Sequence, residues 1–130
     1  MVSILLVDDD ESLRTMLGEV LRRAGYEVQE ACDGLEAGKL YRSHPADLVI
    51  TDLVMPGKEG LEMIMELRQS YPEARIIAMS GGGRNSSGDY LRMAKMFGAQ
   101  RVLDKPFSHQ EILDAVRGVL EAPLYQEREN

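Results

Sequence analysis

The sequence has a single cysteine, no strongly basic segment and no long apolar run, and each of these lacks excludes a class of protein. Because Cys32 has no second cysteine to pair with, an intrachain disulfide and a cysteine-rich metal site are both excluded. No stretch approaches the roughly 20 apolar residues that cross a bilayer, and the first apolar run, starting at Val2, is too short for a signal peptide. We therefore expect a cytoplasmic protein in a reducing environment, with no membrane partner.

Positive charge is scarce, and it is scattered along the chain. The formal net charge is −7 and the pI is about 4.8, whereas binding to nucleic acid phosphates requires clustered Lys and Arg. We therefore expect no direct contact with nucleic acid. The 130 residues show no internal repeat and no low-complexity block, which favours one domain. That domain is predicted to span residues 1–121, followed by a short polar tail at 122–130.

Short apolar runs alternate with segments whose apolar residues recur at helical spacing. The predicted strands are residues 4–7, 26–31, 47–51, 75–79 and 101–104. The predicted helices are residues 13–24, 34–42, 61–70, 91–97 and the segment between Ser108 and Ala122. The strand at 26–31 alternates apolar and polar residues, which places it at a sheet edge. Five strands alternating with five helices predict a three-layer α/β domain with a parallel sheet.

Several polar residues are explained by helix ends alone. Asp10 is suited to cap the first helix, and Gly25 is suited to end it. Ser108 with Glu111 three residues later predicts a capping box at the start of the last helix. Asp10 therefore has a structural explanation that its neighbours in the sequence lack.

Five further polar side chains stand where predicted strands end. They are Asp8, Asp9, Asp52, Ser80 and Lys105. Right-handed crossovers bring the carboxyl ends of parallel strands to one edge of the sheet, where ligand crevices form. Each signal is weak alone, because turns often use such residues, but their joint placement at four of five strand ends predicts a functional site.

Three carboxylates in one place repel one another, so that one of them takes a proton or a cation binds. Mg²⁺ suits such a site, since it binds one or two carboxylates while keeping waters and accepting phosphate oxygens. Zinc is disfavoured because neither Cys32 nor the two histidines fall at these strand ends. With Lys105 and Ser80 present, the set predicts phosphoryl chemistry in which a carboxylate is the nucleophile, and Asp52 is our candidate.

Five short motifs follow one another along the chain: Val7-Asp8-Asp9-Asp10, Asp52 with Met55-Pro56 and Gly60, Met79-Ser80-Gly81, Gly98-Ala99, and Lys105-Pro106-Phe107. Together they resemble the CheY-like receiver domain of two-component response regulators. The resemblance covers about residues 2–121. It implies a doubly wound, flavodoxin-like (βα)5 fold with a five-stranded sheet of order 2-1-3-4-5. It also implies a signalling phosphoacceptor rather than an enzyme, with only Mg²⁺-dependent self-phosphorylation and autodephosphorylation.

The same resemblance implies roles for individual residues. Asp52 would accept a phosphoryl group from a histidine kinase or a phosphotransfer protein. Asp9, Asp52 and the backbone carbonyl of Val54 would bind Mg²⁺, for which Mn²⁺ can substitute, and Asp8 would act through water. Lys105, with a cis bond to the proline that follows it, would pair with the phosphate. The hydroxyl of Ser80 would be the switch that moves toward the phosphate.

The chain also departs from the family pattern. Val102 stands where the family usually has Tyr or Phe, so the aromatic half of the usual switch is missing. We expect activation to appear mainly as ordering of residues 81–89 and repositioning of the fourth helix. Val54 and Gly82 offer no polar side chain to orient water, which predicts slow loss of the phosphoryl group.

Other interpretations remain open from the sequence. Because no output domain follows Leu120, we expect a stand-alone module that acts on a downstream protein through its fourth helix, fifth strand and fifth helix. A receiver domain excised from a longer regulator is the first alternative. A second is a phosphatase with an aspartyl nucleophile, although that family needs an Asp where Val54 stands. A third is an FMN-binding domain, whose phosphate the acidic first turn would repel.

Overall fold

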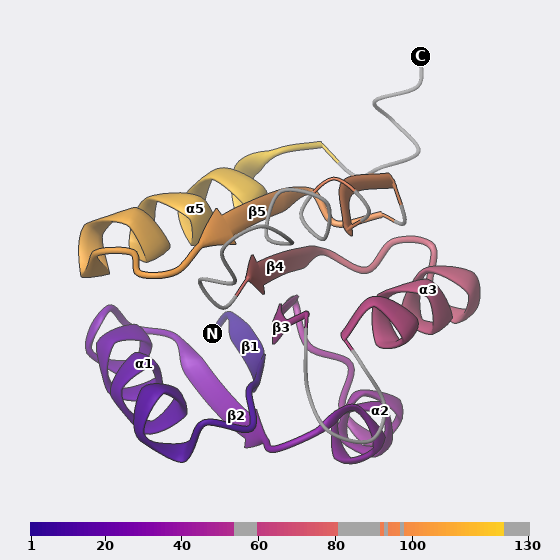
Figure 1. Ribbon diagram of the computed structural model, residues 1–130, viewed down its shortest axis with the longest axis horizontal. Coiled ribbons are helices and arrows are strands. Elements are labelled where there is room, and N and C mark those ends of the chain that lie inside the picture. Colours follow the sequence, from indigo (N-terminus) through magenta and orange to yellow (C-terminus); the bar gives the residue numbers. More distant parts are fainter. Residues whose placement is uncertain (54–59, 81–91, 93, 97, 124–130) are drawn as a thin grey trace.

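A computed structural model describes residues 1–53, 60–80, 92, 94–96 and 98–123 of the chain (Figure 1). The strands are β1 (Ser3–Val7), β2 (Glu27–Ala31), β3 (Leu48–Asp52), β4 (Ile76–Ser80) and β5 (Arg101–Asp104). The helices with complete bounds are α1 (Glu11–Arg23), α2 (Gly34–Ser43), α3 (Gly60–Ser70) and α5 (His109–Glu121). Residues 92 and 94–96 are helical and lie within the expected fourth helix. These bounds lie within two residues of the prediction.

All five strands are parallel and lie in the order β2-β1-β3-β4-β5. This confirms the order 2-1-3-4-5 and the edge position of β2. The two central strands β3 and β4 are buried along their whole length, as expected for strands covered on both faces. β1 and β3 are direct neighbours, with Val7 opposite Thr51, so the residues after these two strands come to the same level of the sheet.

Helices cover both faces of the sheet (Figure 1). On one face, Leu17 and Leu21 of α1 and Ile112 and Val116 of α5 pack against side chains of the inner strands. The opposite face is covered by side chains of α2 and α3, among them Ala37, Tyr41, Ile64 and Leu67. The sheet therefore lies between two apolar clusters, one on each face.

The predicted helix ends are confirmed. The Asp10 side chain accepts a hydrogen bond of 3.2 Å from the Leu13 N–H, as an N-cap does. At α5, the Ser108 hydroxyl accepts from the Glu111 N–H at 3.0 Å, and the Glu111 carboxylate accepts from the Ser108 N–H at 2.7 Å. Such a cap stabilises a protein by about 1 kcal/mol. Asp10 is thus occupied by a structural role, as its position predicted.

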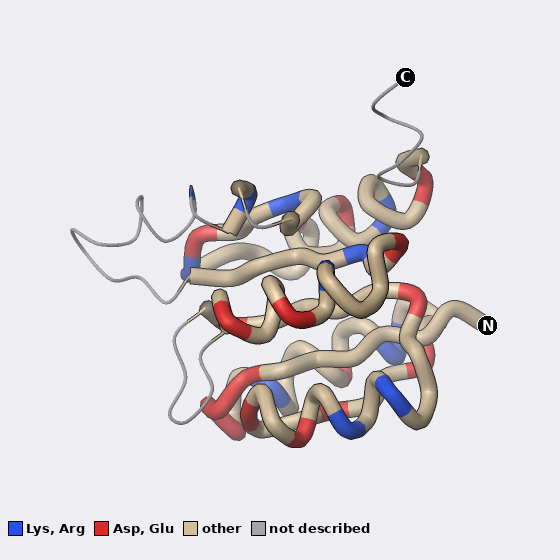
Figure 2. Tube along the Cα trace, turned by 90° about the vertical axis from the view of Figure 1, so that its right-hand side faces the viewer, with Lys and Arg blue, Asp and Glu red and all other residues tan. Residues whose placement is uncertain are grey.

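The surface charge is mixed. In the view of Figure 2, segments of Lys and Arg alternate with segments of Asp and Glu, and the basic residues do not gather into one stripe. None of the helices among the described residues has both the length and the apolar character needed to cross a bilayer.

Candidate functional site

Three carboxylates meet at the carboxyl edge of the sheet. Oxygen atoms of Asp8, Asp9 and Asp52 all lie within 4.8 Å of one another. Asp8 follows β1 and Asp52 ends β3, so the adjacency of these two strands brings the side chains together. Asp8 and Asp52 are buried, whereas Asp9 is exposed. The cluster therefore has buried charge on one side and access to solvent on the other.

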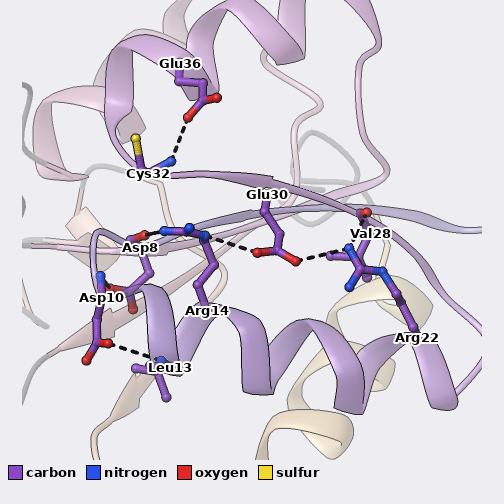
Figure 3. A network of polar contacts seen from close by, with 9 residues as sticks. All are labelled: Asp8, Asp10, Leu13, Arg14, Arg22, Val28, Glu30, Cys32 and Glu36. Atoms are coloured by element: carbon purple, nitrogen blue, oxygen red, sulfur yellow. Dashed lines mark hydrogen bonds and ion pairs between the residues drawn. The ribbon is translucent and has the colours of Figure 1, made fainter.

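Polar contacts hold both the side chain and the backbone of Asp8, and Figure 3 shows those with Asp10 and Arg14. Its carboxylate accepts hydrogen bonds from the Asp10 N–H at 2.9 Å and from Lys105 Nζ at 3.0 Å. Its own N–H donates to the Ala31 carbonyl at 3.1 Å, and its carbonyl accepts from Arg14 Nη1 at 2.7 Å. Because burial of an unpaired charge is costly, these contacts allow Asp8 to remain fully buried.

Lys105 supplies the positive charge of the site. Its Nζ lies 3.0 Å from Asp8 Oδ2 and 3.6 Å from Asp52 Oδ1, so the ammonium bridges the two strands. The backbone N–H of Lys105 donates to the Ser80 carbonyl at 2.9 Å, which fixes the start of the side chain. The bond between Lys105 and Pro106 is cis, as predicted. Among the described residues of the cluster, one ammonium lies against two of the three carboxylates.

The pKa of Asp52 reflects the burial of its carboxyl more than the charges around it. Burial raises the pKa of Asp52 from 3.8 to about 6; the Lys105 ammonium opposes the rise, and the Asp8 and Asp9 charges add to it. The Leu53 N–H donates to Asp52 Oδ1 at 3.0 Å and also favours the charged form. A buried carboxylate whose charged form is disfavoured is stabilised by binding either a proton or a cation.

Ser80 lies beside this cluster on the next strand. It ends β4 directly after Met79, which is the strand partner of Asp52. Ser80 is buried, and its carbonyl accepts the backbone bond from Lys105 described above. The structure thus brings all five polar residues predicted from the sequence to one edge of the sheet.

The ligand set suits a hard divalent cation. All three acidic groups offer oxygen, the donor atom that Mg²⁺ prefers, and the exposed Asp9 leaves room for bound waters. The described residues place neither histidine nor Cys32 in the cluster, so a zinc site is disfavoured here as well. The carbonyl of Val54, a further ligand implied by the resemblance, lies outside the described residues. So do residues 81–89, the segment expected to order on activation.

Comparison with known proteins decides the family. Residues 4–117 match the model of the response regulator receiver domain. The chain belongs to this family. It is 34% identical over 119 residues to the chemotaxis protein CheY of Halobacterium salinarum. This alignment covers 92% of this chain and 97% of that protein. The chain is also 34% identical over 117 residues to sporulation initiation phosphotransferase F of Bacillus subtilis, covering 90% and 92% of the two chains.

Solved structures agree with this family. The receiver domain resembles response regulator protein TrrA of Thermotoga maritima in its complex with Mg²⁺ and BeF, with a TM-score of 0.81 and 34% identity. The likeness covers 92% of this chain and 99% of that one. Membership of the receiver family favours a signalling domain over the phosphatase and FMN-binding interpretations.

A close backbone contact at Gly60 shapes the acidic edge of this receiver domain. Gly60 is the first residue of α3, and its N–H donates to the Leu53 carbonyl at 3.0 Å. A Cβ atom at Gly60 would lie 2.0 Å from the backbone oxygen of Asp52 and 2.7 Å from the Cα of Leu53. Since neither atom belongs to a movable side chain, only glycine fits without shifting the strand that carries Asp52.

Gly60→Ala should therefore destabilise the receiver domain by about 2–3 kcal/mol, measured by urea unfolding. The matched control is Gly38→Ala in α2, where the nearest atom to a new Cβ is the flexible Arg42 Nη1 at 3.6 Å. That change should instead stabilise the protein by about 0.5–1 kcal/mol, because alanine favours helix. Equal stabilities of the two variants would show that the close contact at Gly60 is not needed.

Sequence reasoning missed one residue that contacts the acidic turn. Arg14 had no assigned role, yet its guanidinium bonds the carbonyl of Asp8. The available signal was its spacing: Arg14, Gly18 and Arg22 are four residues apart and share one face of α1. Glu30 of β2 lies against this face, a neighbour that local sequence patterns do not reveal.

Proposed function

We propose that this receiver domain accepts a phosphoryl group on Asp52 in a Mg²⁺-dependent reaction and thereby switches its protein contacts. The observation that carries the proposal is the buried Asp52 carboxylate with Lys105 Nζ at 3.6 Å and two more carboxylates nearby. A carboxylate in this setting is a nucleophile next to groups that can neutralise phosphoryl oxygens. Of the three carboxylates, Asp8 already accepts hydrogen bonds from the Asp10 N–H and from Lys105 Nζ, and Asp9 is exposed, which favours Asp52 as the nucleophile.

In the proposed reaction, an Asp52 oxygen attacks the phosphorus of a phosphohistidine. A P–O bond forms as the P–N bond breaks, and the histidine nitrogen leaves with its electron pair and takes up a proton. The product is an acyl phosphate on Asp52. Lys105 lies close enough to Asp52 to donate to an oxygen of the new phosphoryl group, and Ser80 on the adjacent strand can donate from its hydroxyl.

The three carboxylates are the proposed cation ligands. When bound, Mg²⁺ would neutralise charge that builds up on the phosphoryl oxygens, and Mn²⁺ can replace it. Asp9 and Asp52 would bind the ion directly, while Asp8, which is buried and already bonded to Lys105, would act through a water. The similarity to TrrA, whose structure is a complex with Mg²⁺ and BeF, supports the proposal that this receiver domain binds Mg²⁺ together with a phosphoryl group, which beryllofluoride imitates.

The proposed partners follow from the family. The phosphoryl donor would be a histidine kinase or a phosphotransfer protein, consistent with the similarity to a protein named a sporulation initiation phosphotransferase. The output would be a protein contact on the face formed by the fourth helix, β5 and α5. We assign residues 1–121 to the receiver domain and 122–130 to a polar tail. Val102, which packs in the core beside Ala78, takes the place of the usual aromatic switch residue.

Small phosphodonors provide the test. Intact-mass analysis after incubation with acetyl phosphate and Mg²⁺ should show the gain of one phosphoryl group, and EDTA should prevent it. Calorimetric titration should show one Mg²⁺ site in the untreated protein. No mass gain with any small donor would contradict the proposal. Steady turnover of a phosphomonoester would contradict it too, since that outcome favours the phosphatase class.

A further inference from the structure

Two arginines of α1 hold one glutamate of β2 between them (Figure 3). Arg14 Nε and Arg22 Nη2 each lie 3.1 Å from an oxygen of Glu30. Between the arginines stands Gly18, where a Cβ would lie 2.9 Å from Glu30 Oε2. The missing side chain therefore makes room for the glutamate, which can reach both arginines at once.

Only one of the two arginines also reaches the acidic site. Arg14 Nη1 donates to the Asp8 carbonyl at 2.7 Å, while Arg22 Nη2 donates to the Val28 carbonyl at 3.1 Å, away from the cluster. The guanidinium of Arg14 is thus forked between Glu30 and the first peptide of the acidic turn. A planar guanidinium can make two such bonds at fixed geometry, which an ammonium cannot.

The Asp8 carbonyl, which accepts the bond from Arg14, lies at the start of the acidic turn. Asp8 follows the last residue of β1 and is fully buried, so its carbonyl needs a donor within the protein. The same peptide unit leads directly to Asp9, the exposed member of the carboxylate cluster. Fixing this carbonyl fixes the rotation of the peptide and hence the direction in which the Asp9 side chain leaves the backbone.

We propose that Arg14 is a positioning residue of the divalent cation site, holding the peptide between Asp8 and Asp9 so that the Asp9 carboxylate stays directed into the cluster. Glu30 in turn holds Arg14. The inference rests on the proposed Mg²⁺-dependent function. It concerns affinity for the cation and not the phosphoryl transfer itself, since Arg14 contacts a backbone atom of the site rather than the reacting groups.

Charge and positioning predict opposite results when Arg14 is neutralised. If Arg14 acted only through its positive charge, Arg14→Gln would remove a repulsive charge near the site and strengthen Mg²⁺ binding. If Arg14 positions the turn, the same variant weakens binding, because changes behind the ligands of a metal typically lower affinity about 10-fold or more. The sign of the change in Kd therefore separates the two roles.

The test is calorimetric titration of MgCl₂ into the wild type, Arg14→Gln and the control Arg23→Gln. Arg23 is exposed on the same helix, so its variant removes the same charge without touching the turn. We expect the Mg²⁺ Kd of Arg14→Gln to rise about 10-fold, with Arg23→Gln within about twofold of the wild type. At saturating Mg²⁺, phosphoryl uptake from acetyl phosphate should return to within about twofold of the wild-type rate.

An unchanged or lower Kd in Arg14→Gln overturns the inference while leaving the proposed function intact. A wild type that binds no Mg²⁺ overturns both. Should Arg14→Gln fail to fold, Arg14→Lys decides in its place. A single ammonium cannot make the forked contact, so its Mg²⁺ Kd should rise at least about threefold, and an unchanged Kd would overturn the inference.

Discussion

Asp52→Asn should reduce phosphoryl uptake from acetyl phosphate to background. An amide oxygen is a poor nucleophile, and the variant loses both the attacking group and one ligand of the proposed cation site. This is the largest effect that we expect from any single substitution in the chain. The measurement is the fraction of protein that gains a phosphoryl group, determined by intact mass at several times in Mg²⁺ buffer.

The control for this experiment is Asp114→Asn. Asp114 is exposed on α5, where it faces Arg117 at 3.8 Å, and this change removes a carboxylate without touching the acidic cluster. Uptake by Asp114→Asn should match that of the wild type. If Asp52→Asn were phosphorylated at the wild-type rate, the nucleophile would have to be another group.

The second large effect is a fall in the stability of the metal-free wild type as the pH rises, caused by the raised pKa of Asp52. Below about pH 3 the Asp52 carboxyl is protonated in both folded and unfolded states and contributes almost nothing to the pH dependence of stability. As the pH rises to about 6, the unfolded chain loses the proton first, so the folded state binds more protons and its stability falls. Above this range the loss is constant, about 3 kcal/mol for a pKa raised from 3.8 to about 6.

Asp52→Asn should remove this loss. In EDTA at pH 8, its free energy of unfolding should exceed that of the wild type by about 2–3 kcal/mol, and at pH 3 the two should be nearly equal. Urea unfolding followed by circular dichroism at both pH values measures the difference. If the advantage of the variant were as large at pH 3 as at pH 8, titration of Asp52 would not be its cause.

At pH 8, Mg²⁺ should reduce the difference in the free energy of unfolding between the wild type and Asp52→Asn. A cation at 10 times its Kd stabilises the folded wild type by about 1.4 kcal/mol through mass action. Asp52→Asn has lost a ligand and should gain less. Addition of Mg²⁺ that stabilised both proteins equally would show that Asp52 does not take part in the cation site.

Much of the fold could be predicted because local pattern and global topology agree in this chain. β3 and β4 each begin with an apolar run and proved to be buried along their whole length, while alternation in β2 marked it as an edge. The adjacency of β1 and β3 is different. It depends on contacts between segments more than 40 residues apart, and it entered the prediction through the resemblance to receiver domains.

Some features of the site could also be predicted from the sequence, and others could not. Asp8, Asp52 and Lys105 were predictable because each directly follows or ends a strand, and parallel strands bring such residues to one edge. That Lys105 lies nearer to Asp8 than to Asp52 was not predictable, since it depends on side-chain packing. Arg14 was missed because a polar helix residue looks alike in sequence whether it faces solvent or a buried carbonyl.

The most direct measurement is to locate the acyl phosphate on the chain. Phosphorylated protein is reduced with borodeuteride, which converts an aspartyl phosphate to deuterium-labelled homoserine, and peptides are then sequenced by mass spectrometry. The proposed function predicts labelled homoserine at position 52 alone, and only when Mg²⁺ was present during phosphorylation. Label at another aspartate, or no label in protein that had gained a phosphoryl group, would contradict it.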